Sequence, residues 1–180
     1  MGQIQATAGN QSARIKVNRP KFKDVWSKYP VHMDAQSVYK LVGGNAYELF
    51  KTNPTGYANA CALRLSRSFN YGGVTITKGA TGYKVQGGDD KYYLLRVKDM
   101  ISFVKANFGS PDISVKPDGK DVSEKFKGKN GILIFTVSGW GDASGHVTLW
   151  NGSDCGDHCY FMHPNQPNAK TTDVFFWELK

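Results

Sequence analysis

Hydrophobic residues recur at helical spacing along the first two thirds of the chain. Their positions predict a helix over 34–42, which Asp34 caps and Gly43 ends. A second helix is expected over 45–53 and a third over 97–107, where apolar residues return every three or four positions. This part of the chain is therefore expected to be mainly helical.

The segment YANACALRLSRSFN, residues 57–70, has a clear helical pattern. Cys61, Leu65 and Phe69 follow one another at intervals of four residues, so they share one face of the expected helix. Gly72 then ends the helix. Cys61 falls in its first turn.

The last third changes to strand patterns. Residues 132–137 form a continuous apolar run typical of a buried strand, and residues 146–150 alternate between two faces. The other expected elements are short: strands over 74–77, 83–85, 160–162 and 174–179, and a helical turn over 121–126. Helices followed by antiparallel strands predict an α+β fold.

The chain is expected to form a single domain over residues 21–180. Residues 1–20 are mostly polar and end at Pro20, which predicts a loosely ordered arm. The longest apolar run, 132–137, is far shorter than the ~20 residues of a membrane-spanning helix. Residues 1–13 lack the apolar core of a secretory signal. We therefore expect a protein made in the cytoplasm without a signal peptide and not inserted in a membrane.

Positive charge dominates the composition. The 180 residues include 23 Lys and Arg against 15 Asp and Glu, a formal net charge of +8. This balance favours an anionic partner, such as an acidic protein or a cell-wall polymer. The basic residues are spread from Arg14 to Lys180 without a continuous stripe, which argues against nucleic acid.

Three cysteines, an odd number, leave at least one thiol unpaired in a monomer. Cys155 and Cys159 are close enough in sequence to form a disulfide or to lie near one metal ion. With His158 and His163 they would also make a compact zinc knuckle, although all four ligands would crowd onto one short segment. The spacing alone does not decide between these alternatives.

Cys61 is a candidate nucleophile because of its place at a helix start. The positive end of the helix dipole stabilises a thiolate, and the free N–H groups of the first turn can face a developing oxyanion. A buried structural cysteine is the alternative. His146 is the candidate base: it begins a strand behind the glycine-rich loop SGWGDASG, and on a two-residue period it shares a face with Thr148 and Trp150. We expect that face to meet a packed helix.

Asp157 is the candidate third member of a triad. It lies 11 residues after His146, enough for a strand, a turn at Asn151 and a returning segment that brings the carboxylate beside the imidazole. Asp154 is the competing carboxylate. The chain contains no HExxH, Walker A or strand-linked GxGxxG motif, so no metal or nucleotide cofactor is expected.

Two segments, NACALRLSRSFN and SGHVTLWNGSDCGDHCYF, carry a family resemblance. They are similar to the type VI secretion amidase effectors of family four, within the NlpC/P60 branch of the papain-like superfamily. The matching motifs are the helix start at 61–66, the strand at 145–150, and the aspartate between the cysteines at 155 and 159. The resemblance implies a papain-like α+β fold in which N-terminal helices, with the nucleophile at a helix start, pack on a C-terminal antiparallel sheet.

The resemblance also implies roles and partners. Cys61 would be the nucleophile, His146 the general base, Asp157 the orienting acid, and Cys155 and Cys159 a disulfide pair. The implied activity is an antibacterial peptidoglycan amidase that cuts the γ-D-glutamyl-meso-diaminopimelate bond of stem peptides without a cofactor. The implied partners are the type VI secretion apparatus and a periplasmic immunity protein, and the site of action is the target cell's periplasm. A papain-like acyltransferase and a non-enzymatic zinc-binding or wall-binding module are the alternatives.

Overall fold

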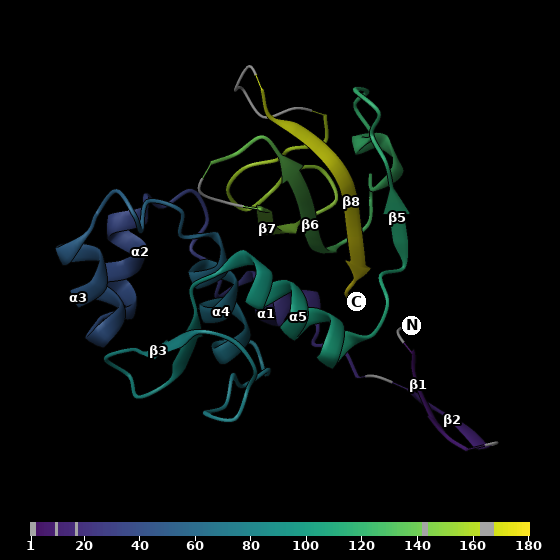
Figure 1. Ribbon diagram of the computed structural model, residues 1–180, viewed down its shortest axis with the longest axis horizontal. Coiled ribbons are helices and arrows are strands. Elements are labelled where there is room, and N and C mark those ends of the chain that lie inside the picture. The colour runs from purple at the N-terminus through teal and green to yellow at the C-terminus, as the bar shows by residue number, and fades with distance from the viewer. Residues whose placement is uncertain (1–2, 10, 17, 142–143, 163–167) are drawn as a thin grey trace.

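The computed structural model describes residues 3–9, 11–16, 18–141, 144–162 and 168–180. Helices gather on one side of the molecule and a sheet on the other, while a hairpin formed by the N-terminal residues extends away from both (Figure 1). The α+β class predicted from the order of the elements is confirmed. Among the described residues, no helix combines the length and apolar character needed to cross a bilayer.

The α-helices follow one another over the first two thirds of the chain. They are α1 (Phe22–Trp26), α2 (Ala35–Val42), α3 (Gly44–Thr52), α4 (Cys61–Tyr71) and α5 (Val97–Phe108). At α2, a carboxylate oxygen of Asp34 accepts the N–H of Ser37 at 2.9 Å, which confirms the predicted cap. Gly43, with φ of 67°, separates α2 from α3 in a conformation that favours glycine. Helix α1 was not predicted.

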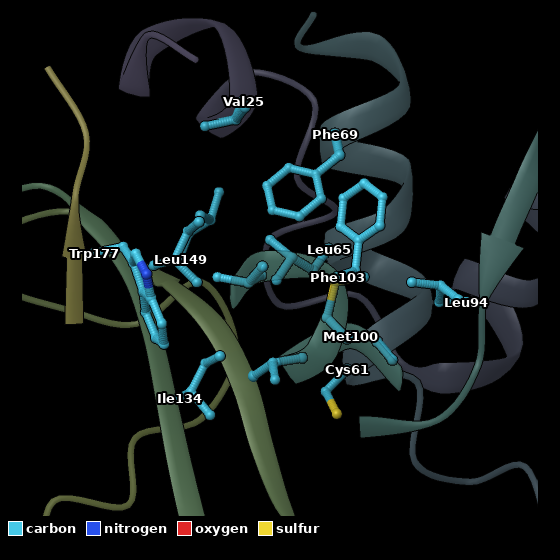
Figure 2. Packing of buried hydrophobic residues seen from close by; sticks show 14 of the residues in the cluster. Val25, Cys61, Leu65, Phe69, Leu94, Met100, Phe103, Ile134, Leu149 and Trp177 are labelled. Atoms are coloured by element: carbon cyan, nitrogen blue, oxygen red, sulfur yellow. The ribbon is translucent and has the colours of Figure 1, made fainter. Parts of the chain in front are cut away.

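Helix α4 lies at the centre of the helical side. It begins at Cys61, two to four residues later than the start expected near 57–59, and it is buried on almost every side. Leu65 and Phe69 pack with Met100 and Phe103 of α5, and Cys61 lies at the edge of this cluster (Figure 2). Surrounded in this way, the first turn of α4 is held rigidly.

The main sheet has four antiparallel strands among the described residues. They are β5 (Ile113–Val115), β6 (Gly131–Ser138), β7 (Gly145–Trp150) and β8 (Lys170–Glu178), in the order β5-β8-β6-β7. The buried run 132–137 lies within β6, as predicted, and β7 forms one edge of the sheet. A side chain at Gly145 would come within 2.2 Å of the Phe135 carbonyl oxygen, so the glycine before His146 allows close pairing of β6 and β7.

The two faces of the sheet contact different parts of the molecule. Ile134 and its cross-strand partner Val147 pack against helices α4 and α5. Phe135, whose cross-strand partner is His146, belongs to a second cluster on the opposite face. The expectation that a helix packs on the His146 face is therefore wrong, because the helices cover the Val147 face.

Several short elements differ from those predicted. Residues 74–77 and 160–162 do not form strands. The strand expected over 83–85 is β3 (Lys84–Gln86), and it pairs with β4 (Tyr92–Leu94), which was not predicted. The expected helical turn is the 3₁₀-helix η1 (Ser123–Lys125). Strands this short carry too few alternating positions for their periodicity to be recognised.

The expected arm at 1–20 contains an antiparallel hairpin that the sequence pattern did not indicate. Its strands are β1 (Gln3–Ala8) and β2 (Gln11–Lys16). After the hairpin, the guanidinium of Arg19 forms an ion pair with Asp112 and donates to the carbonyls of Glu178 at 3.1 Å, Phe108 at 3.2 Å and Ser110 at 3.2 Å. The chain is thereby fixed to the main domain just before α1. The domain boundary at residue 21 stays a prediction.

Candidate active site

Cys61 is the first residue of α4. Its thiol is free, and the residue is buried, with only 2% of its surface exposed. The residue before it, Ala60, offers no side-chain cap to the helix. Instead the side-chain oxygen of Asn59 accepts the N–H of Cys61 at 3.2 Å. Asn59 therefore fixes the backbone at the candidate nucleophile, a contact that the sequence pattern does not predict.

His146 is the second residue of β7 and is 5% exposed. Its Nε2 lies 3.0 Å from Oδ1 of Asp157, and Tyr160 packs edge-on against the imidazole at a centroid distance of 5.1 Å. Cys61 lies close enough to His146 to raise the pKa of the imidazole. Because Nε2 is occupied by Asp157, Nδ1 is the ring nitrogen that is left for the thiol.

Asp157 reaches His146 because the chain turns back along the free edge of β7. The turn is built on the Asn151 side-chain oxygen, which accepts the N–H groups of Ser153 at 3.0 Å and Asp154 at 2.8 Å. A β-bridge then joins Cys155 to Trp150, and Gly156 donates to the Leu149 carbonyl at 2.9 Å. The geometry expected for this returning segment is the one observed.

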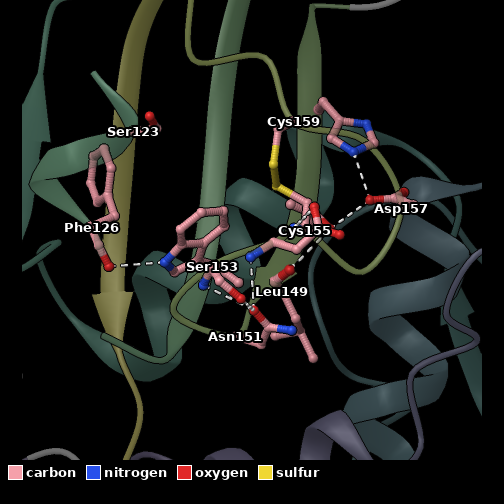
Figure 3. The surroundings of a disulfide bond; sticks show 12 residues. Ser123, Phe126, Leu149, Asn151, Ser153, Cys155, Asp157 and Cys159 are labelled. Atoms are coloured by element: carbon pink, nitrogen blue, oxygen red, sulfur yellow. Dashed lines mark hydrogen bonds and ion pairs between the residues drawn. A yellow bond between two sulfur atoms is a disulfide. The ribbon is translucent and has the colours of Figure 1, made fainter. Parts of the chain in front are cut away.

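The competing carboxylate, Asp154, serves its own loop. Its Oδ1 accepts the N–H of Cys155 at 2.8 Å, and the residue is exposed. Cys155 and Cys159 form a disulfide with a Cα–Cα distance of 5.6 Å, and Figure 3 shows Asp157 beside this bridge. The bridge closes a small loop around Asp157 and limits how far its backbone can move.

Three further side chains surround the buried carboxylate of Asp157, which is 5% exposed. Thr148 donates to Oδ1 at 2.5 Å, and the hydroxyl of Tyr29 lies 3.3 Å from the Thr148 hydroxyl. On the other oxygen, Nε of Arg64 lies 3.7 Å from Oδ2. Arg64 also donates to the carbonyls of Pro30, at 2.9 Å, and Met33. This guanidinium links Asp157 to the wall of the cleft.

The electrostatics of the pair follow from this arrangement. Burial by itself lowers the pKa of His146, but the carboxylate of Asp157 and the neighbouring Cys61 outweigh it and raise that pKa to about 10. Burial raises the pKa of Asp157. The charge of His146 and the hydrogen bonds from His146 and Thr148 outweigh burial and lower that pKa to about 2. Near neutral pH the imidazole is therefore protonated and the carboxylate ionised, a state suited to a partner thiolate.

The helix start and the histidine meet at the rim of the sheet. Because β7 is an edge strand, α4 can pack on its Val147 face while His146 on the other face still reaches the start of α4. The pairing of Cys61 with His146 was predicted, but the geometric reason given for it was not the one the fold uses.

A cleft of about 520 Å³ opens over these residues. Cys61, His146 and Asp157 contribute to its lining, and so do Asn59 and Arg64. Other parts of the wall come from four large or polar side chains, His32, Trp140, His158 and Tyr160. A buried thiol, an imidazole and a carboxylate grouped at a cleft can carry out acyl transfer.

The zinc knuckle is not compatible with the disulfide, because the bridge consumes two of its four ligands. His163, a third ligand, lies outside the described residues. In the described part of the chain, no group of three or more His, Cys, Asp and Glu could hold a metal ion.

Three residues of the site carried sequence signals of different strength. Arg64 lies three positions after Cys61 inside an apolar helix, so a buried charge next to the nucleophile could have been inferred from helical spacing. Thr148 was expected on the His146 face, although not as a partner of Asp157. Tyr29 precedes a loop and has no pattern that would have indicated it.

The family model that matches residues 57–177 is described as type VI secretion system (T6SS), amidase effector protein 4, or Tae4. A comparison with curated proteins gave no significant match.

Solved structures give the same result. The Tae4 effector of Enterobacter cloacae is 38% identical, with a TM-score of 0.81, over 92% of this chain and 100% of its own. In the effector–immunity complex Tae4–Tai4 from the same organism, the matching chain is 39% identical over 91% of this chain and 100% of its own, with a TM-score of 0.82. In the Tae4–Tai4 complex from Salmonella Typhimurium, the matching chain is 34% identical over 91% of this chain and 100% of its own, with a TM-score of 0.79. The chain therefore belongs to the Tae4 family of type VI secretion amidase effectors.

Proposed function

We propose that this protein is a cysteine amidase of the papain-like NlpC/P60 type, with Cys61 as nucleophile, His146 as base and Asp157 as the orienting acid. The observation that supports the proposal is that Cys61, His146 and Asp157 lie together in the lining of the cleft, with His146 next to both of the others. Membership in an amidase effector family supports the reaction class.

The mechanism follows from the positions of the three groups. The Cys61 thiolate attacks the carbonyl carbon of the amide, and the carbonyl oxygen becomes an oxyanion next to the N-terminal end of α4. The His146 imidazolium then gives its proton to the departing amine as the C–N bond breaks. Water, deprotonated by the now neutral His146, hydrolyses the thioester, which releases the acid and restores the Cys61 thiolate and the His146 imidazolium.

Asp157 acts by holding His146. Its bond to Nε2 fixes the ring orientation and leaves Nδ1 directed to the thiol, while its charge stabilises the imidazolium. Thr148 and Arg64 in turn hold the carboxylate. All the groups in this scheme are side chains and backbone of this chain, and the proposal includes no cofactor.

The proposed substrate is the bond between the γ-carboxyl of D-glutamate and meso-diaminopimelate in peptidoglycan stem peptides. The positive net charge of +8 favours this anionic polymer. As an effector, the protein would be exported by the type VI apparatus and act on the wall in the periplasm of a target cell. Related effectors are found in complex with the immunity protein Tai4, and we propose a periplasmic immunity partner of this kind.

The test is digestion of purified muropeptides, followed by mass spectrometry of the products. We expect the wild-type protein to release fragments cut at the γ-D-glutamyl bond, and Cys61→Ala and His146→Ala to lose at least about 1000-fold in kcat/KM while staying folded. Asp157→Asn should retain residual activity, because an orienting acid contributes less than the nucleophile or base. Asp154→Asn is the matched control and should be close to wild type.

Two results would contradict the assignment. Full cleavage by folded Cys61→Ala would exclude this cysteine as the nucleophile. A greater loss in Asp154→Asn than in Asp157→Asn would show that the wrong carboxylate had been chosen.

A further inference from the structure

A second hollow adjoins the catalytic cleft. It measures about 500 Å³, and Asn59 lines both cavities. Its walls come from the connection between α3 and α4, through Asn53 and Tyr57, and from the start of α5, through Arg96 and Lys98. We call it the Arg96 hollow. A peptide bound over Cys61 that extends past Asn59 would enter it.

Two tyrosines and a guanidinium belong to the lining of the Arg96 hollow. The guanidinium of Arg96 lies over the ring of Tyr83 at 4.6 Å from the centroid. Tyr57 and Tyr83 both line the hollow, and the positive charge of Arg96 acts to lower the pKa of Tyr57. Stacking on Tyr83 holds the guanidinium in place while its N–H groups stay available.

The two basic side chains of the Arg96 hollow have no ion-pair partner within the described part of the chain. There, neither Arg96 nor Lys98 forms an ion pair or a side-chain hydrogen bond, and both residues are exposed. The carboxylate of Asp99 accepts the N–H of Tyr83 at 3.0 Å and forms no ion pair with either basic side chain. The start of α5, which has no side-chain cap, adds the positive end of a helix dipole.

We propose that the Arg96 hollow binds a free carboxylate of the stem peptide and thereby sets the position of the scissile amide over Cys61. A guanidinium beside phenolic hydroxyls matches a carboxylate, which accepts two parallel N–H bonds from arginine. The volume of about 500 Å³ suits an amino-acid unit that carries the carboxylate rather than a lone ion. This inference rests on the proposed peptidoglycan substrate.

The test combines variants of Arg96 with substrates that lack one carboxylate. The substrates are a disaccharide tetrapeptide and three derivatives, amidated at the D-glutamyl α-carboxylate, at the free diaminopimelate carboxylate or at the C-terminus. We expect Arg96→Gln to raise KM for the parent substrate about tenfold, or about 1.4 kcal/mol, with kcat within about twofold. Arg96→Lys keeps the positive charge but cannot donate two parallel N–H bonds, so it should raise KM by less.

The matched control is Arg67→Gln. Arg67 also lies over a tyrosine ring, that of Tyr71 at 5.0 Å, but it does not line either cavity. Its loss changes the net charge equally and should leave KM within about twofold, because only the distant field changes. The derivative that lacks the carboxylate bound by the Arg96 hollow should have a raised KM with the wild type. Arg96→Gln should not raise the KM of that derivative any further.

The possible outcomes separate the two proposals. If the wild type cleaves the parent substrate but Arg96→Gln raises KM no more than Arg67→Gln, the Arg96 hollow is not the carboxylate subsite and the proposed function stands. The same holds if Arg96→Gln affects all three amidated derivatives as strongly as the parent. If the wild type cleaves none of the substrates, the proposed function and the subsite both fail.

Discussion

Asp157 receives contacts from four directions, and this makes it the fixed point of the candidate site. Its first carboxylate oxygen is held by His146 and Thr148, and its second faces Arg64. The disulfide loop restrains its backbone. A buried carboxylate with so many partners cannot rotate away from the imidazole without leaving charges unpaired.

The titration of His146 should report both of its partners. The pKa of about 10 results from Asp157 and Cys61 together, opposed by burial. We expect the pKa to fall below 10 in Cys61→Ala and to fall further in Asp157→Asn, because Asp157 is the stronger of the two influences. NMR titration of the imidazole protons measures both values. An unchanged pKa in Asp157→Asn would contradict the observed pairing.

The raised pKa of His146 also determines how the stability of the fold depends on pH. Since the folded-state pKa of His146 is above its ordinary 6.5, the stabilisation by protonated His146 is complete below pH 6.5 and is lost as the pH rises through about 10. The folded-state pKa of Asp157 is lowered, so its contribution is present above pH 3.8 and is lost as the pH falls through about 2.

The sequence pattern identified all three members of the proposed triad but not what supports them. Cys61, His146 and Asp157 are residue types with known chemistry at a helix start, a strand start and a turn, so they could be selected without a structure. Tyr29 could not, because its contact with Thr148 joins positions 119 residues apart and leaves no local pattern. Contacts of this kind depend on the tertiary arrangement alone.

At the scale of elements, the returning segment along β7 determines whether the site is assembled. It adds one bridge, between Trp150 and Cys155, to the open edge of the strand.

The hydrophobic pattern predicted the long helices and the buried strand β6 correctly, since these have enough residues to show a period. It failed for 160–162, where aromatic side chains fill the second cluster without strand pairing.

The disulfide should matter more for turnover than for folding. It closes a loop between residues only four positions apart, so restriction of the unfolded chain contributes only about 2 kcal/mol. In the Cys155→Ser, Cys159→Ser double variant, we expect kcat to fall about tenfold, because Asp157 is less well placed, and the melting temperature to fall by only a few degrees. Enzyme kinetics and thermal unfolding of the two proteins measure these effects.

Thiol counting is the control for this prediction. Under denaturing, non-reducing conditions the wild-type protein should show one reactive cysteine, Cys61. Unchanged turnover in the double variant would mean that the turn at Asn151 positions Asp157 without the bridge.

For the whole molecule, Arg19 joins parts that are distant in sequence. Its guanidinium contacts the end of α5, the connection to β5 and the end of β8. Nearby, the N–H of Phe22 donates to the carbonyl of Lys180 at 2.8 Å. The segment before α1 and the residues after β8 are thus closed together, and the helical side is held to the sheet.

Replacing Arg19 by methionine should lower the free energy of unfolding by about 2 kcal/mol, because three backbone carbonyls and the Asp112 carboxylate lose a charged donor. Arg67→Met is the control, since Arg67 donates to the Lys28 carbonyl alone and is partly exposed. Urea denaturation of both variants gives the comparison. Equal stability of the two would show that the arginine does not join these segments in solution.

The position of β8 has a consequence for how the protein is made. This strand, residues 170–178, lies between β5 and β6 and so must be inserted into the interior of the sheet. It is the last of the described strands to leave the ribosome during translation, and until then β6 lacks its main partner. The nascent chain cannot complete the sheet that carries His146, and folding must wait for contacts that are far apart in sequence. A chain that ends before residue 170 therefore lacks the strand that completes the sheet carrying His146.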